Sequence, residues 1–566
     1  MEINPQLESV HTTRMSTSDA QEKSPLPPCL LARTTKRWVL KLLVWLPAII
    51  VLTPVLLVVV RAFAPADADW TMVVQNRLPG YLWQTFALAF CVTTLAILIG
   101  VPCAWLVSAY RFPGRNSLVW LLMLPMSMPG YVASLAYVDM LQSLTPLYLW
   151  VRRTFGLDAF LLVQHWTPWV FAVLVLATTL FPYVFLSCRA VFSRQATAAL
   201  ESARSLGAHG MRCFFRVALP MARPAVVAGA TLVAMETVND YGVVASFGLT
   251  PLTPGIFRSW TEGHPVVAMR LAVILMGIVL LAQSLEIWQR GRRGFCIEND
   301  DTIPAGKKLA GLPVLATWMI CGLPIFFGFL LPFGRLLHWS TQSWRSNDWS
   351  GHWQAAWHSF AIAGGTAVII AFAAFVLAAG HRAFPCISMA IARRCGALGY
   401  AVPGALIAVG IGFTVSSIAR HLPGGEALAL SASTFGLVVA GFVRYLAVGL
   451  HPVIAGFEKI PRSLHDAARS LGCGPLRAVH TVDWPLVRPT VVAGATFAFV
   501  DLFKELPLAL ILRPLDFESL ATRVFRLTDE GRIPHAAVPG LAMILMCMIG
   551  LIPLTRMLRR ASSESC

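Results

Sequence analysis

Long runs of apolar residues constrain this chain more than any other feature. About twelve runs are long enough to cross a bilayer as helices, since about 20 apolar residues suffice. They lie at roughly 38–61, 82–108, 117–142, 163–188, 223–247, 265–288, 309–335, 355–380, 396–419, 426–455, 488–513 and 535–556. The alternating strands of a membrane barrel are absent from them, and lipid allows only helices or closed barrels. The sequence therefore predicts an all-α polytopic membrane protein with about 12 transmembrane helices.

The charges indicate an orientation in the membrane and not a polyanionic partner. Charged residues make up only 13% of the chain, against about 25% in a soluble domain. The net charge is +17, but with the N-terminus inside, about 30 of the 45 Lys and Arg residues fall on the cytoplasmic side. This positive-inside bias predicts cytoplasmic N- and C-termini. We expect contacts with the lipid bilayer and none with nucleic acid.

The 12 cysteines predict neither a disulfide nor a metal site. On this topology they lie in the spans or on the cytoplasmic side, where thiols stay reduced. No pair has CxxC spacing, so we assign no metal ligands from the sequence.

One segment of the chain occurs twice. Residues 203–231 read ARSLGAHGMRCFFRVALPMARPAVVAGAT, and residues 468–496 read ARSLGCGPLRAVHTVDWPLVRPTVVAGAT. About 16 of the 29 aligned positions are identical, where unrelated stretches would match at about two. The period of about 265 residues is far longer than a solenoid repeat. We therefore interpret the chain as two duplicated halves.

Each half contains six predicted spans, and because six is even, both halves enter the membrane from the same side. This arrangement predicts parallel repeats related by an axis along the membrane normal. Pro129-Gly130 interrupts the third span as Pro403-Gly404 interrupts the ninth, and the first half has an outside loop at 143–162. The predicted divisions are a disordered cytoplasmic N-terminal tail (1–35), a first transmembrane domain (36–288), a cytoplasmic linker (289–308), a second transmembrane domain (309–560) and a C-terminal tail (561–566).

The repeated segment lies in a charged cytoplasmic loop, at 189–222 in the first half and 456–487 in the second. A carboxylate near the start of each copy suits the positive end of a helix dipole. A glycine, Gly207 or Gly472, can take positive φ and turn the chain into a second short segment, which we expect a proline to end. The pattern predicts a compact helix–turn–helix that docks a soluble partner. An interfacial helix lying on anionic lipid is the alternative.

The pattern Glu-x-Ala-x3-Gly-x9-Val-x-Leu-Pro, from Glu201 to Pro220, resembles the EAA loop of permease subunits of ABC importers. The departures are Ser202, where the family has Ala, and Trp484, where the family usually has Leu. In that family the loop forms the coupling helix, which seats in a groove of the nucleotide-binding subunit. The resemblance implies coupling residues Glu201, Ala203, Gly207, Leu219, Pro220, Asp466, Ala467, Ala468, Gly472 and Pro485.

The resemblance covers most of the chain after about residue 80. Residues 236–242 (ETVNDYG), 253–260 (TPGIFRSW) and 504–507 (KELP) look like the iron(III) branch of fused permeases. It implies a bacterial inner-membrane permease that receives substrate from a periplasmic binding protein, with iron(III) as the expected cargo. Thiamine, polyamines, phosphonate and sulfate are alternatives, because their permeases share much of the pattern. It also implies no cofactor on this chain, with ATP and Mg²⁺ bound by a dimer of ATPase subunits.

Four carboxylates lie inside the predicted spans. Glu236 and Asp501 are 265 positions apart, and so are Asp240 and Glu505. Within each helix the two carboxylates are i and i+4 and share one face. Ionisable groups at this depth are costly and usually face a pathway or a partner.

Two interpretations of these charges stay open. In one, a translocation pathway is lined by Glu236, Asn239, Asp240, Asp501, Lys504 and Glu505, and its hard oxygen ligands suit a hard cation. In the other, Lys504 and Arg444 neutralise the carboxylates structurally, or the group lies in the outer vestibule.

The motifs argue against an enzyme. No P-loop, nucleophile elbow or HExxH sequence is present, so energy has to come from a partner. An ion-coupled secondary carrier would be compatible with parallel repeats, but it would not need duplicated docking loops. A membrane-embedded enzyme would need a catalytic constellation, and none is visible.

Overall fold

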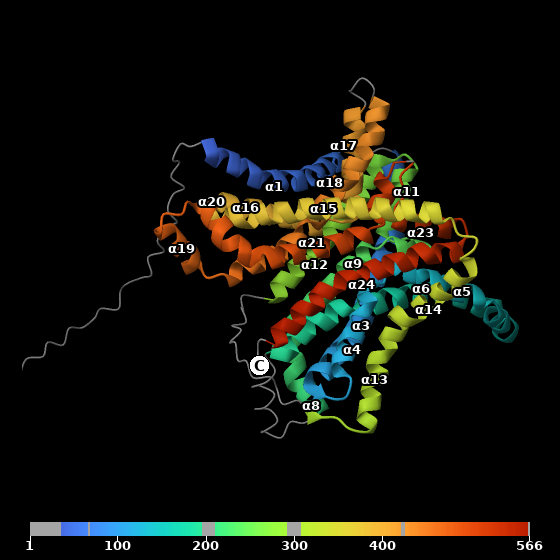
Figure 1. The fold of residues 1–566 in the computed structure, drawn as a ribbon. Helices are drawn as coiled ribbons and strands as arrows, with labels where there is room; N and C mark the ends of the chain where they lie inside the picture. Colours follow the sequence, from blue (N-terminus) through green and yellow to red (C-terminus); the bar gives the residue numbers. More distant parts are fainter. Residues whose placement is uncertain are drawn as a thin grey trace, which may run out of the picture.

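The structure is a computed structural model that describes residues 35–65, 68–194, 210–290, 307–419, 425–514 and 516–563. The regular elements within these ranges are helices, apart from one two-residue parallel bridge, β1 (Tyr110–Arg111) with β2 (Lys307–Lys308). Figure 1 shows the long helices packed into one bundle, in which some run nearly perpendicular to others.

The helices of the first half are α1 (Thr35–Ala62), α2 (Ala68–Asn76), α3 (Leu78–Ala109), α4 (Arg115–Leu121), α5 (Gly130–Ser143), α6 (Thr145–Arg194), α8 (Met211–Cys213), α9 (Leu219–Asn239), α10 (Gly242–Ser246), α11 (Leu252–Thr261) and α12 (Pro265–Arg290). Those of the second half are α13 (Leu312–Ile325), α14 (Leu331–Ser343), α15 (Trp349–Ala383), α16 (Ile387–Ala397), α17 (Gly404–Ala419), α18 (Gly425–Lys459), α19 (Arg462–Ser470), α20 (Pro475–Ala478), α21 (Trp484–Phe503), α22 (Pro507–Leu512), α23 (Leu520–Asp529) and α24 (Ile533–Ser563). Short 3₁₀ or π-helical turns lie at Leu124–Ser127, Phe214–Ala218, Phe326–Leu330, Leu398–Ala401 and Val479–Asp483.

The prediction of an all-α membrane protein is confirmed. Among the described residues, 10 helices are long and apolar enough to cross a membrane, and counting two bent pairs as spans raises the number to 12. The bent pairs are the predicted third and ninth spans, which turn by 86° and 105° at their Pro-Gly sequences. Proline cannot donate a backbone hydrogen bond and disfavours helix at the residue before it, so each span breaks there.

The segment 143–162, predicted to be an outside loop, is not irregular. These residues are helical, because α6 begins at Thr145, directly after α5 ends at Ser143. Gly156, with φ 88° and ψ −176°, bends the segment into a helical hairpin that projects at the right of Figure 1 (teal). Only a glycine adopts this conformation without strain, whereas the flanking Leu, Trp and Phe residues tolerate helix.

The sequence predicts that the prolines after the repeated loops end a segment, and this prediction is wrong. Pro220 and Pro485 lie in the first turn of α9 and α21. A π-helical turn precedes each one, so the helix runs without a break from Met211 to Asn239 in the first half. The wider turn accommodates the carbonyl that proline cannot pair.

The first helix of each half packs against the other half. On α1, Trp45 Nε1 donates to Ser388 Oγ of α16 at 3.0 Å. In the opposite direction, Tyr137 Oη of α5 donates to Phe327 O, between α13 and α14, at 2.5 Å. One buried apolar cluster accordingly joins α3, α5 and α6 to α13, α14 and α24, and a second joins α1 and α12 to α15–α18. The two halves therefore form one interlocked body.

Candidate functional site

A cavity of about 130 Å³ lies between the two halves. Helices α5, α6 and α9 of the first half and α18 and α21 of the second contribute to its wall. The wall contains all six residues that the sequence assigned to a pathway, namely Glu236, Asn239, Asp240, Asp501, Lys504 and Glu505. The shared register of about 265 residues therefore brings the two predicted groups together.

Asp240 and Glu505 occupy equivalent positions in the backbone. Each follows the end of a long helix, and each carboxylate accepts a hydrogen bond from the backbone N–H three residues later. The acceptor atoms are Asp240 Oδ1 for Val243 N, at 2.8 Å, and Glu505 Oε1 for Leu508 N, at 3.4 Å. The carboxylates thus help to begin the short helices α10 and α22, in the manner of N-caps, while they line the cavity.

The two carboxylates of the second half have cationic partners. Lys504 Nζ lies 2.9 Å from Asp501 Oδ1, and Arg444 Nε lies 3.6 Å from Glu505 Oε2. Tyr445 Oη also donates to Glu505 Oε2. The Arg444 and Glu505 side chains are only 10% and 11% exposed, so each would be a buried charge without the other.

The two carboxylates of the first half lack such partners. Glu236 Oε1 accepts a hydrogen bond from Tyr400 Oη at 2.8 Å, but no cationic group of the described residues lies within 4.0 Å of Glu236 or Asp240. Asn239 occupies the position that Lys504 has in the second half, and its Oδ1 is buried without a hydrogen-bond partner. With four carboxylates and two cations, the cavity wall carries a formal charge of −2.

Sequence reasoning missed the tyrosines of the cavity. Tyr131, Tyr183, Tyr400 and Tyr445 all lie on its wall. Tyr131 directly follows the Pro-Gly break of the third span, and Tyr400 lies three residues before that of the ninth. A polar aromatic residue beside a broken span was the available signal, because irregular backbone at membrane depth is tolerated where it lines a cavity.

The second repeated loop has the predicted helix–turn–helix form. Its first helix is α19, and Gly472 follows with φ 87°. Cys473 N donates to Ala468 O and Leu471 N to Ala467 O, both at 3.1 Å, which closes the helix end around the glycine. The side chain of Leu471 is 86% exposed. An exposed leucine in the turn after a short helix suits contact with another protein.

The first repeated loop is described only in part. Glu201, Ala203 and Gly207 lie outside the described residues, whereas Leu219 and Pro220 begin α9. In the second loop, Asp466, Ala467 and Ala468 lie on α19, and Pro485 lies in the first turn of α21.

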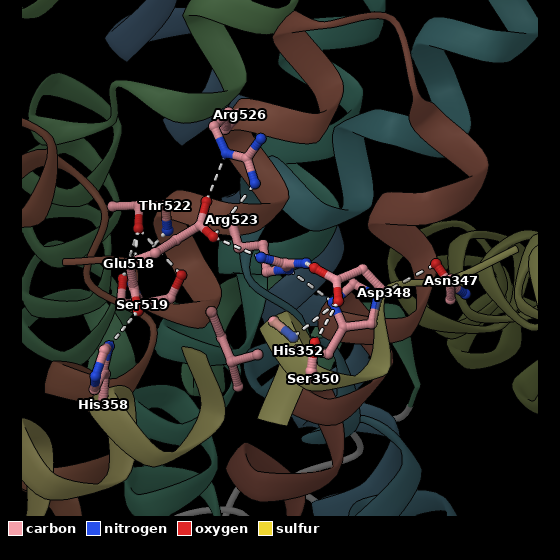
Figure 2. Close-up of polar contacts among 12 residues, drawn as sticks. Asn347, Asp348, Ser350, His352, His358, Glu518, Ser519, Thr522, Arg523 and Arg526 are labelled. Atoms are coloured by element: carbon pink, nitrogen blue, oxygen red, sulfur yellow. Dashed lines mark hydrogen bonds and ion pairs between the residues drawn. The ribbon is translucent and has the colours of Figure 1, made fainter. Parts of the chain in front are cut away.

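A further polar group, the Arg523 cluster, was not predicted. We define it as Asn347, Asp348, His352, Glu518, Arg523 and Arg526 (Figure 2). The Arg523 guanidinium donates to three acceptors, Glu518 Oε2 at 2.6 Å, Asp348 Oδ2 at 2.8 Å and His352 Nδ1 at 2.8 Å. Figure 2 shows this side chain between the other charged groups. Asp348 directly precedes α15, Glu518 lies just before α23, and Arg526 lies on α23.

The carboxylates of the Arg523 cluster are held in the ionised form. Hydrogen bonds from Gly351 N, Ser350 Oγ and Arg523 hold the pKa of Asp348 well below its usual range. Burial opposes ionisation of Glu518, but hydrogen bonds from Arg526 and Arg523 outweigh it and lower the pKa of this carboxyl. The cluster therefore ties α15 to α23 through charged groups at neutral pH.

Comparisons with known proteins identify the class. The family described as "binding-protein-dependent transport system inner membrane component" matches residues 96–285. A probable molybdenum ABC transporter permease protein of Haloferax volcanii is 30% identical over 235 residues, which cover 39% of this chain and 81% of that protein. The chain belongs to this family of inner-membrane permeases.

Two further relatives are named for different substrates. The Fe(3+)-transport system permease protein FbpB 2 of Haemophilus influenzae is 25% identical over 531 residues, 90% of this chain and 96% of that protein. The sulfate transport system permease protein CysW of Escherichia coli is 31% identical over 202 residues, 35% of this chain and 66% of that protein. The first alignment spans both halves, as a two-repeat fusion requires.

Membership of the family has direct consequences. The chain is a multi-pass inner-membrane protein and the permease component of an ABC importer, which is not itself catalytic. A partner ATPase uses the ATP, and the permease binds no cofactor. Among the described residues, no three His, Cys, Asp or Glu side chains gather closely enough to hold a metal ion.

Proposed function

We propose that this chain is the fused permease of an ATP-driven importer that carries iron(III) across the bacterial inner membrane. The similarity to FbpB 2 over 90% of the chain supports this substrate. We infer that the duplicated halves, 36–288 and 309–560, are two parallel permease domains that together replace a permease pair.

The observation that carries the proposal is the charge of the central cavity. Its wall has a formal charge of −2, and Glu236 and Asp240 have no cationic partner among the described residues. A negative wall in a low-dielectric setting raises the local concentration of cations and repels oxyanions such as sulfate and molybdate. We propose electrostatic guidance through this cavity and not a fixed coordination site.

The partners follow from the family and from the repeated loops. We propose that a dimer of ATPase subunits grips 189–222 and 456–487, and that a periplasmic binding protein delivers substrate at the opposite face. Closure of the ATPase dimer would rock the two halves between inward and outward openings. The exposed Leu471 beside the turn at Gly472 supports a protein partner at this surface.

Uptake by the assembled complex tests the substrate. The permease, its ATPase and its binding protein are reconstituted in proteoliposomes, and ATP-dependent uptake of radioactive iron(III), sulfate and molybdate is compared. We expect uptake of iron and of neither oxyanion. Uptake of sulfate or molybdate without iron would assign the chain to the oxyanion branch, and ATP-independent uptake would favour a secondary carrier.

The orientation has its own test. We propose that both termini and both repeated loops are cytoplasmic, because the Lys and Arg residues are concentrated on that side. Cys296, which lies in the linker and outside the described residues, should react with a membrane-impermeant thiol reagent only after the cell is opened. Labelling in intact spheroplasts would contradict the topology.

A further inference from the structure

A guanidinium at the end of α15 contacts the backbone that begins the second repeated loop. Arg382 is the second-last residue of α15, and its Nη2 donates to both Ile460 O and Pro461 O at 3.1 Å. These two carbonyls lie between α18, which ends at Lys459, and α19, which begins at Arg462. One side chain therefore connects a membrane span directly to the helix expected to meet the ATPase.

The two carbonyls belong to a helix end that needs donors. The last carbonyls of a helix have no partner within the helix, and arginine near such an end satisfies them. Ile460 directly follows α18, and Pro461 O also accepts a hydrogen bond from Leu464 N, at 3.3 Å, in the first turn of α19. Arg382 thus contacts the point at which the chain changes direction between the two helices.

We propose that Arg382 is a positioning residue that fixes the start of α19, so that movement of α15 is transmitted to the second coupling helix. This inference rests on the proposed role of the repeated loops. The planar guanidinium reaches both carbonyls from one nitrogen.

The length and rigidity of α15 support this role. It has 35 residues without an internal proline, which corresponds to about 52 Å of helix. Its first turn carries His352 of the Arg523 cluster, and its last turn carries Arg382. In Figure 1, α15 crosses the bundle from the side of α23 to the side of α19 and α20. The helix is therefore held by arginine contacts at both ends.

In the register of α3 and α15, the first half has a serine at the place of Arg382. Leu252 N donates to Thr85 Oγ1 at 3.0 Å, and Leu520 N donates to Ser359 Oγ at 2.8 Å, so α3 corresponds to α15 with an offset of 274 residues. The same offset pairs Arg382 with Ser108. Instead, Trp105 packs on Phe192 and Phe214, with ring centroids 5.5 and 5.4 Å apart, at the base of the first loop. With the offset of 265 residues between the repeated loops, Ile460 and Pro461 correspond to positions 195 and 196, which lie outside the described residues.

Arg382→Met and Arg382→Lys test the proposal in the full complex. Methionine keeps the apolar stem without a donor, and lysine keeps a donor without the planar fork. Arg394→Met, an exposed residue of α16, is the matched control. Transport, basal ATPase activity and ATPase activity stimulated by the binding protein are measured, together with hydrogen exchange over 462–471.

We expect Arg382→Met to speed hydrogen exchange in α19 about fivefold and to lower stimulated ATPase activity and transport. Basal ATPase activity should stay within about twofold of the wild type, and lysine should restore part of each loss. Unchanged exchange over 462–471 in Arg382→Met would overturn the inference. If that variant does not accumulate, unchanged exchange in Arg382→Lys would do so.

The exchange measurement separates this inference from the proposed function. Faster exchange in α19 with normal stimulation would mean that Arg382 positions a helix that does not couple, and the proposed role of the loop would then be wrong. Equal effects of Arg394→Met and Arg382→Met would also contradict a specific positioning role.

Discussion

The two walls of the central cavity have carboxylates at equivalent positions, but only the wall from the second half also has cationic side chains. In the second half, Asp501 and Glu505 are paired with Lys504 and Arg444. In the first half, Asn239 takes the place of Lys504, and Glu236 and Asp240 contact only uncharged donors. Duplication thus retained one register, while the partners of the charges diverged. We propose that the first-half carboxylates are available to a cargo, whereas those of the second half hold the bundle together.

Removing Arg444 should have the largest effect. Arg444→Met leaves Glu505 buried without its cation, and breaking a buried pair in this way costs about 3–5 kcal/mol. We expect the variant to be lost from the membrane, as measured by its abundance and by thermal unfolding in detergent. The double variant Arg444→Met with Glu505→Gln should recover abundance. Normal abundance and stability of Arg444→Met would contradict a structural role for the ion pairs of the second half.

Straining the turn of the second loop should have the next largest effect. Gly472 has φ 87°, so Gly472→Val strains the backbone by about 1–3 kcal/mol and misplaces α19. Transport should fall while the protein remains in the membrane. Gly474→Val is the control, because Gly474 has no positive φ and a side chain there meets nothing within 4 Å.

If the two loops are equivalent, Gly207→Val should reproduce the effect of Gly472→Val. Normal transport and normal ATPase association in both glycine variants would argue against coupling through these loops.

Neutralising the first-half carboxylates should affect transport and not stability. Glu236→Gln and Asp240→Asn keep size and hydrogen-bonding capacity, so the packing changes little. We expect uptake of iron to fall about tenfold, the equivalent of about 1.4 kcal/mol, at normal abundance. Asp516→Asn, at an exposed position, is the control. Loss of protein instead of transport would give these residues the structural role assigned to Glu505.

A substitution in the Arg523 cluster should have the smallest effect, on the pH dependence of stability. The pKa values of Asp348 and Glu518 are lowered in the folded protein. Their stabilisation is therefore present above the unfolded pKa values of about 4, and it is lost as the pH falls below them. Asp348→Asn should reduce the drop in unfolding temperature between pH 5 and pH 3 by about 1 °C, because Asp348 is largely exposed. An unchanged pH dependence would mean that the cluster does not contribute.

The equivalent position in the first half lacks this charge. Gly255 lies against the ring of Tyr81, 2.8 Å from the place where a Cβ would lie, and with the offset of 268 residues between α11 and α23 it corresponds to Arg523. The adjoining ion pair is shared, because Arg258–Glu262 and Arg526–Glu530 both have a distance of 2.7 Å. Helices α11 and α23 therefore show the same contrast as the cavity: the two halves share a register, but only the second half has the additional arginine.

The sequence predicted the spans and the acidic register because both depend on local patterns. Apolar runs mark helices in lipid, and a repeat of about 265 residues places Glu236 opposite Asp501 without knowledge of the packing. The hydrogen bonds from Tyr400 to Glu236 and from Tyr445 to Glu505 could not be predicted. The tyrosines come from other spans, and only the tertiary packing decides which spans are neighbours. Tertiary packing also decides that α1 and α13 pack against the opposite half, and that Asp348 meets Arg523. The helical hairpin was missed because its apolar residues lie between two spans.

The central claim is that unpaired carboxylates of the first half meet the translocating cation. Asn239→Lys recreates, three residues after Glu236, the spacing of Asp501 and Lys504. An added charge at about 4 Å is worth about 1–4 kcal/mol in water or near a protein surface, so ATP-dependent iron uptake should fall at least about fivefold at normal abundance. Asn239→Gln, the neutral control, should transport nearly normally. Normal uptake by a stable Asn239→Lys protein would contradict the account.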